Sequence, residues 1–161
     1  MTVAIRPAVP ADAATVHAFV VELAAYERLA HAVRSTPADI AEALFCPHPR
    51  AFCDIAERDG RPAGMALWFY DFSTFTGRHG LYLEDLYVRP EHRRHGLGRA
   101  LLARLARRCR DEGLTRLQWS VLDWNAPAIA FYRGLGAALQ DEWTGCRLDG
   151  AALARLGEEP A

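Results

Sequence analysis

The chain has 161 residues, 51% of them hydrophobic, and its 19 basic and 20 acidic residues leave a formal net charge of −1. This length is enough for a core of its own, and the near-neutral balance argues against a nucleic acid partner. No apolar run reaches the ~20 residues of a membrane span, and the first residues do not resemble a secretory signal. We therefore expect a single domain over residues 1–161, cytoplasmic and with no membrane partner.

The first part of the chain predicts one strand and two helices. Residues 3–6 form a short strand pattern, and residues 10–29 carry apolar side chains at helix spacing. Thr36 followed by Pro37 is a typical helix start, because the hydroxyl caps free N–H groups and proline fits the first turn. A second helix is therefore expected over residues 36–44.

The middle of the chain predicts three strands. Residues 51–57 form the first, and residues 64–72, rich in aromatic side chains, form the second. Asp59-Gly60 lies between them and is a pair typical of tight hairpin turns. After a loop over residues 73–80, residues 81–88 form a third strand.

The remainder predicts helices separated by shorter strands. A glycine-containing loop leads into a helix with one apolar stripe, which Gly113 ends. A strand over residues 117–122 and a short helix over residues 127–135 follow, and one or two further strands are expected up to Leu148. This order of elements predicts an α/β (α+β) fold with a mixed sheet flanked by helices.

Arg93, Gly96 and Gly98 form an Arg-x-x-Gly-x-Gly loop between a predicted strand and a predicted helix. Glycines let backbone N–H groups approach a phosphate closely, and the positive end of the helix dipole favours an anion there. The spacing differs from that of a P-loop and from that of the dinucleotide motif. We predict a phosphate site, with an ordinary glycine-rich helix start as the alternative.

Glu84 and Asp85 are adjacent carboxylates within the predicted strand 81–88. Strict alternation would place Tyr82, Glu84 and Leu86 on one face and the others on the opposite face, so the two carboxylates would not share a proton. A carboxylate inside an apolar run is costly to bury and suggests a role in chemistry. A structural salt bridge or an edge position is the alternative.

Three further side chains could act chemically but have plainer interpretations. Tyr132 falls on the short helix after Asn125, where a tyrosine most often packs half-buried. His92 and His95 flank the glycine loop and are expected to be solvated. Neither these residues nor the four cysteines follow a metal-site spacing, so no metal is expected.

Taken together, these motifs resemble the GNAT superfamily of acyl-CoA-dependent N-acyltransferases. Within it, the chain is similar to the diamine (spermidine/spermine) acetyltransferases and especially to the thialysine Nε-acetyltransferases. The resemblance extends over most of the chain, and the matching segments are Ile5 to Ala8, Glu22 to Glu27, Tyr82 to Val88, the glycine loop, Leu122 to Asn125, Phe131-Tyr132 and Arg147-Leu148. It implies a mostly antiparallel mixed sheet, acetyl-CoA as co-substrate and a homodimer.

The resemblance also implies how acetyl-CoA is bound. The glycine loop would hold the pyrophosphate, through Arg93, Arg94, His95, Gly96, Leu97, Gly98 and Arg99. The end of the preceding strand would pair with the pantetheine arm like an added strand, through Leu86, Tyr87 and Val88. The start of the short helix would line the other side of the cofactor, through Asn125, Ala126, Pro127 and Ala128.

By the same resemblance, Tyr132 is the general acid that protonates the departing thiolate, and Glu84 is the general base, acting through a water. A primary amine with a pKa near ~10.4 is protonated at neutral pH and cannot attack a thioester until a base removes its proton. A backbone N–H near Leu86 would polarise the thioester carbonyl. The acetyl group would pass directly to the amine in a ternary complex.

The acceptor is expected to be a small primary amine, either a thialysine-like amino acid or a diamine. The residues that match acceptor-site positions of the family, together with nearby candidates, are Tyr26, Glu27, Ser73, Thr74, Glu84, Asp85, Gln118, Trp119 and Ser120. Ser73-Thr74 matches the thialysine type, whereas the polyamine enzymes have an acidic residue followed by proline. This favours a shorter amine with a zwitterionic end.

Two alternatives stay open. The same chemistry could serve a different acceptor, such as a polyamine, an antibiotic amine or a protein N-terminus. A catalytically silent acyl-CoA-binding sensor is the alternative from another class, although a sensor would need neither Glu84 nor Tyr132.

Overall fold

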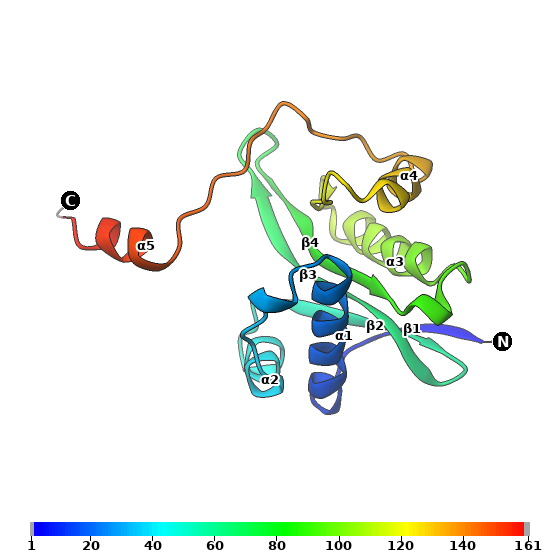
Figure 1. Cartoon of the computed structure of the whole chain (residues 1–161). Helices are drawn as coiled ribbons and strands as arrows, with labels where there is room; N and C mark the ends of the chain where they lie inside the picture. The colour runs from blue at the N-terminus through cyan, green and yellow to red at the C-terminus, as the bar shows by residue number, and fades with distance from the viewer. Residues whose placement is uncertain (1, 160–161) are drawn as a thin grey trace. The chain divides into compact units, whose positions relative to one another are not determined.

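A computed structural model describes residues 2–159, which fall into two compact units, residues 2–122 and residues 123–159. Figure 1 shows the elements of both units in chain order. The first unit contains β1 (Val3–Pro7), α1 (Ala13–Tyr26), α2 (Pro37–Phe45), β2 (Phe52–Arg58), β3 (Arg61–Ser73), β4 (Arg78–Val88), α3 (Leu97–Glu112) and β5 (Leu117–Gln118). The second contains α4 (Ala126–Gly134) and α5 (Gly150–Gly157). The single-domain organisation stays a prediction.

The strands of the first unit form one sheet in the order β1-β2-β3-β4-β5. Neighbouring strands from β1 to β4 are antiparallel, and β5 alone runs parallel to its neighbour β4. The mixed, mostly antiparallel sheet predicted from the sequence is therefore confirmed. Among residues 2–159, no helix is long and apolar enough to cross a membrane.

The helices α1 and α2 cover one face of the sheet, where the main core cluster lies (Figure 1). Phe19 of α1 is fully buried and its ring centroid lies 5.9 Å from that of Tyr87 on β4. The strands contribute Cys53, Ile55 and Met65 to the same cluster. Because side chains alternate along a strand, these positions define the α1 face.

The helix α3 covers the opposite face through an apolar stripe that is fully or almost fully buried, made of Leu97, Leu101, Leu102 and Leu105. Asp54 of β2 points to this face, where its carboxylate accepts hydrogen bonds from Trp68 Nε1 at 3.0 Å and Arg104 Nε at 2.6 Å. The guanidinium of Arg108 lies over the Trp68 ring, 4.8 Å from the centroid. This network satisfies a carboxylate that would otherwise be costly to bury.

Two local features were predicted correctly from short-range signals. Thr36 caps α2, accepting from the Asp39 N–H at 3.3 Å while the Asp39 carboxylate accepts from the Thr36 N–H at 2.7 Å. Asp59 and Gly60 both have positive φ, 51° and 74°, as a tight hairpin between β2 and β3 requires.

Several predicted boundaries were wrong. The helix expected to reach Leu29 ends at Tyr26, because Arg28 has φ 64° and the Leu29 N–H turns back to the Ala24 carbonyl at 2.7 Å. The strand expected over residues 117–122 has two residues, Leu117–Gln118. The strands expected up to Leu148 are absent from the described residues, where α5 follows instead.

Candidate active site

A β-bulge lies at Glu84 in β4. Leu67 of β3 lies opposite Asp85 and Trp68 lies opposite Leu83, so Glu84 is the extra residue between them. The bulge reverses the alternation that the sequence predicted. Leu83, expected on the same face as Asp85, points instead to the α3 face with Trp68, while Asp85 points to the α1 face.

In the described part of the chain, the edge of β4 next to β5 has no strand paired with it beyond Tyr82. The strand β5 pairs with β4 only at Leu81 and Tyr82. No strand among residues 2–159 pairs with this edge from Leu83 to Val88. Unpaired backbone groups of this kind can bind an extended ligand as a further strand would.

The open edge leads into the glycine loop at the start of α3. Gly96, with φ 81°, is the residue immediately before the helix, and only glycine adopts this conformation readily. No side chain caps the helix start. The first N–H groups of a helix have no intrahelical partner, so those of Leu97, Gly98 and Arg99 are available to an anion.

The side chains of the loop divide into two groups. Arg94, His95 and Arg99 are exposed around the helix start. Arg93 instead donates from Nε to the Val88 carbonyl at 2.9 Å, and its guanidinium lies 4.9 Å from the Tyr26 ring centroid. Arg93 therefore holds the loop against the end of β4 and the end of α1.

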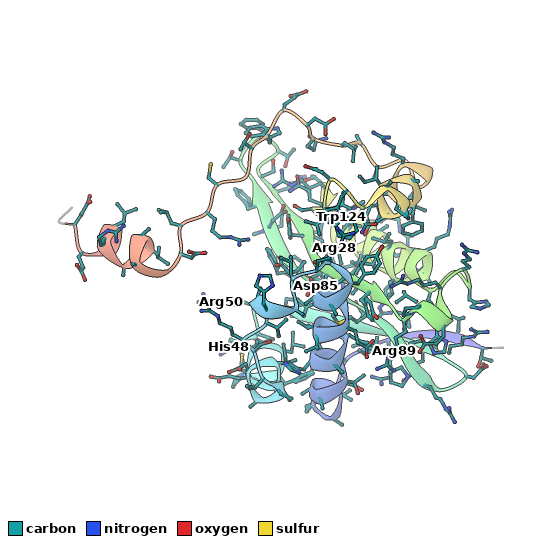
Figure 2. The ribbon with its side chains drawn as sticks, viewed as in Figure 1. Arg28, His48, Arg50, Asp85, Arg89 and Trp124 are labelled. Carbon is teal, nitrogen blue, oxygen red and sulfur yellow. The ribbon has the colours of Figure 1, made fainter. Side chains whose placement is uncertain are left out.

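An open pocket of about 390 Å³ lies on the α1 face, next to Asp85. The last turns of α1 form one wall with apolar side chains and Glu27, and the segment from Leu29 to Ser35 forms another. Figure 2 shows Asp85 near the end of α1, where Arg28 follows the helix. The pocket is therefore small, largely apolar and lined by two carboxylates, features that suit a small cation.

The surroundings of the pocket raise the pKa of both Asp85 and Glu27. Burial, reinforced by the negative charges of Glu84 and Glu27, raises the pKa of Asp85 from 3.8 to about 6. Burial also raises the pKa of Glu27. Both carboxylates would be stabilised by a cation in the pocket, because it would offset the cost of burying their charge.

An ion pair fixes α1 to the residue that follows β4. Arg89 donates to the Glu22 carboxylate at 2.8 Å from Nη2 and at 3.0 Å from Nε, and this contact lowers the pKa of Glu22. Figure 2 shows Arg89 beside α1. This contact holds α1, which ends directly before Glu27, beside the strand that carries Asp85.

The structure does not bring every expected acceptor residue to this pocket. Ser73 is the last residue of β3, six residues beyond the partner of Asp85, which is about 20 Å along the strand, and Thr74 follows it. Gln118 donates to the Asp71 carboxylate at 2.8 Å, and Ser120 Oγ lies 2.8 Å from the Tyr82 hydroxyl. Trp119 lies between them, just after β5.

The remaining candidates are in the second unit. Asn125 caps α4, and its side chain accepts from the Ala128 N–H at 3.3 Å. Ala126, Pro127 and Ala128 form the first turn of α4, and Tyr132 lies on its last turns with the Phe131 ring 5.4 Å away.

Sequence reasoning missed the segment from Leu29 to Ser35, including Arg34, which lines the pocket. No spacing pattern marks this segment, and all basic residues of the chain are arginines, so one arginine carried no signal. Among residues 2–159, no group of histidine, cysteine or acidic residues could hold a metal ion.

Comparisons with known proteins show which family and which fold this chain resembles. A family model described as "Acetyltransferase (GNAT) family" matches residues 19–137. A thialysine N-epsilon-acetyltransferase from Caenorhabditis elegans is 39% identical over 141 residues, 86% of each chain. The L-ornithine N5-acetyltransferase NATA1 from Arabidopsis thaliana is 30% identical over 92% of this chain and 85% of its own. Among solved structures, an integron cassette protein from the mobile metagenome of V. cholerae matches with a TM-score of 0.81 and 26% identity over 99% of each chain.

Proposed function

Because the chain belongs to the GNAT acetyltransferase family, we propose that it transfers the acetyl group of acetyl-CoA to a primary amine of a small molecule. The observation that carries this proposal is the pocket lined by Asp85 and Glu27 beside the open edge of β4. A cationic amine fits the pocket, and the edge leads to a helix start that suits a pyrophosphate.

For acetyl-CoA, we propose two contact regions in the first unit. The N–H groups of Leu97, Gly98 and Arg99, with Arg94 and His95 around them, would bind the pyrophosphate. The backbone of Leu86, Tyr87 and Val88 would pair with the pantetheine arm along the open edge. Arg93, held by the Val88 carbonyl, would position this loop. Residues Asn125 to Ala128 are proposed for the opposite side of the cofactor.

The reaction is direct transfer in a ternary complex. Glu84, exposed at the bulge, accepts the proton of the ammonium through a water. The amine nitrogen then attacks the thioester carbon, whose oxygen accepts a hydrogen bond from the Leu86 N–H. The C–N bond forms, the C–S bond breaks, and the Tyr132 phenol donates its proton to the departing thiolate. The second proton that the nitrogen loses on becoming an amide then returns to the Tyr132 phenolate, which restores the acid.

Asp85 is a second candidate for the base, favoured by its raised pKa of about 6. A base titrating near neutral pH is well suited to accept a proton from an ammonium. The Glu84→Gln and Asp85→Asn variants separate the two candidates. The variant that removes the base lowers kcat and abolishes the acidic limb of its pH profile, whereas the other keeps that limb.

The acceptor we propose is a thialysine-like amino acid or a diamine. Two relatives are named for thialysine and for ornithine, both amino acids with a side-chain amine. Ser73 and Thr74, which suggested this branch in the sequence, line no part of the pocket. A polyamine, an antibiotic amine or a protein N-terminus would use the same chemistry. We also propose a cytoplasmic homodimer, and light scattering of the purified protein would test the dimer.

The amine reaction is tested by initial rates of thiol release with acetyl-CoA and amine varied together. Direct transfer gives intersecting double-reciprocal lines, whereas parallel lines would indicate an acyl-enzyme. A sensor without catalysis would bind acetyl-CoA and release no thiol with any amine. Mass spectrometry of the product identifies the acetylated nitrogen.

A further inference from the structure

Three charged side chains line the pocket, and they differ in sign. Glu27 and Asp85 are carboxylates, and Arg34 is a guanidinium on the segment that follows α1. The other lining residues are apolar apart from Ser35. A ligand complementary to this set carries two cationic groups and one anionic group.

The segment that carries Arg34 is fixed by contacts at the two residues that follow it. The His17 Nε2–H on α1 donates to the Ser35 carbonyl at 2.7 Å. Thr36, the next residue, caps α2 through its reciprocal hydrogen bonds with Asp39. The backbone at Arg34 is therefore held at the pocket, although its side chain is exposed.

The Arg34 guanidinium has no ion-pair partner among residues 2–159, since the salt bridges there involve other arginines. An arginine at the rim of a pocket for cations is unfavourable for a ligand that is only cationic, because like charges repel. The same arginine binds a carboxylate through charge-assisted, often bidentate, hydrogen bonds.

We propose that Arg34 binds the α-carboxylate of the acceptor, so that the pocket selects basic α-amino acids over diamines of the same chain length. This inference rests on the proposed function. Asp85 takes the side-chain ammonium that is acetylated, since it lies on β4 next to the open edge. Glu27, at the C-terminal end of α1, takes the α-ammonium. Each of the two ammonium groups of the ligand then lies against a carboxylate, and its carboxylate lies against the Arg34 guanidinium.

The test uses ornithine with putrescine and lysine with cadaverine, since each pair differs only in the α-carboxylate. Wild type, Arg34→Gln and Arg34→Lys are compared by kcat/KM for thiol release. They are also compared by calorimetric binding of each amine in the presence of CoA. Arg61→Gln, which replaces an exposed arginine at the β2–β3 hairpin, is the control. Thermal unfolding establishes that each variant is folded.

Loss of a hydrogen bond to a charged group corresponds to a roughly 10- to 100-fold effect. We expect Arg34→Gln to raise KM and Kd for the amino acids by this factor. Putrescine and cadaverine should bind equally well or better, and Arg34→Lys should restore part of the preference. An equal change in KM and Kd for the amino acid and the diamine of a pair, or no change for either, would overturn the inference. Selective binding that depends on Arg34 without thiol release would support the inference and contradict the proposed function.

Discussion

Replacing Asp85 with asparagine should stabilise the protein while impairing its activity. The carboxylate is half-buried on the α1 face, near two other acidic side chains, and its pKa rises from 3.8 to about 6. Keeping it ionised in the folded state therefore opposes folding at neutral pH. The asparagine side chain has nearly the same shape and no charge.

The size of the stability change follows from the pKa shift of Asp85. A rise of about two pKa units corresponds to roughly 3 kcal/mol at 1.36 kcal/mol per unit, and the asparagine amide gives some of this back because it is also desolvated. We expect Asp85→Asn to raise the free energy of unfolding by about 2–3 kcal/mol at pH 7.5. The raised pKa of Asp85 lowers the stability of wild type only at pH values where the carboxyl group is ionised. The stability gained by the variant should therefore shrink as the pH falls from 6 to 3.8. At pH 4 it should be less than about 1 kcal/mol.

Urea unfolding of wild type and Asp85→Asn at pH 7.5, 5.5 and 4 measures this directly. Asp111→Asn, on an exposed carboxylate of α3, is the control and should change stability by less than about 0.5 kcal/mol. A variant less stable than wild type at pH 7.5 would refute the reasoning. So would a gain that does not depend on pH.

Three further predictions concern the cofactor, the acid and the core. Tyr132→Phe should lower kcat by about 100-fold or more because the thiolate loses its proton donor, with acetyl-CoA binding by calorimetry within about twofold of wild type. Gly96→Ala should destabilise the protein by about 1 kcal/mol and raise the KM for acetyl-CoA, because φ 81° is unfavourable for alanine although its Cβ would meet no atom within 4 Å. Leu101→Ala, at a fully buried position of α3, should cost about 2–5 kcal/mol in urea unfolding; a cost below about 1 kcal/mol would contradict the packing described.

Signals confined to a few neighbouring residues predicted the structure well. Thr36 and the Asp59-Gly60 pair determine the local backbone through their own hydrogen bonds and conformational preferences, so the sequence alone was sufficient. The glycine loop was recognised because a strand, glycines and a helix follow each other directly. The mixed sheet followed from the order of these elements.

Features that depend on distant partners were not predictable. The bulge at Glu84 appears only when β4 is paired with β3, and it placed Leu83 and Asp85 on opposite faces. The pocket exists because the chain turns back after Arg28, which brings Arg34 near Glu27 and Asp85. Ser73 and Thr74 were assigned to the acceptor site by resemblance alone. The sequence did not show that they lie at the β3–β4 hairpin, away from the pocket.

The most direct test of the proposed activity is thiol release from acetyl-CoA by wild type with a panel of amines: thialysine, ornithine, lysine, putrescine and spermidine. We expect release that depends on the amine, with an N-acetylated product of matching mass and the highest kcat/KM for an amino acid. Tight acetyl-CoA binding with no amine-dependent release for any member of the panel would contradict the account.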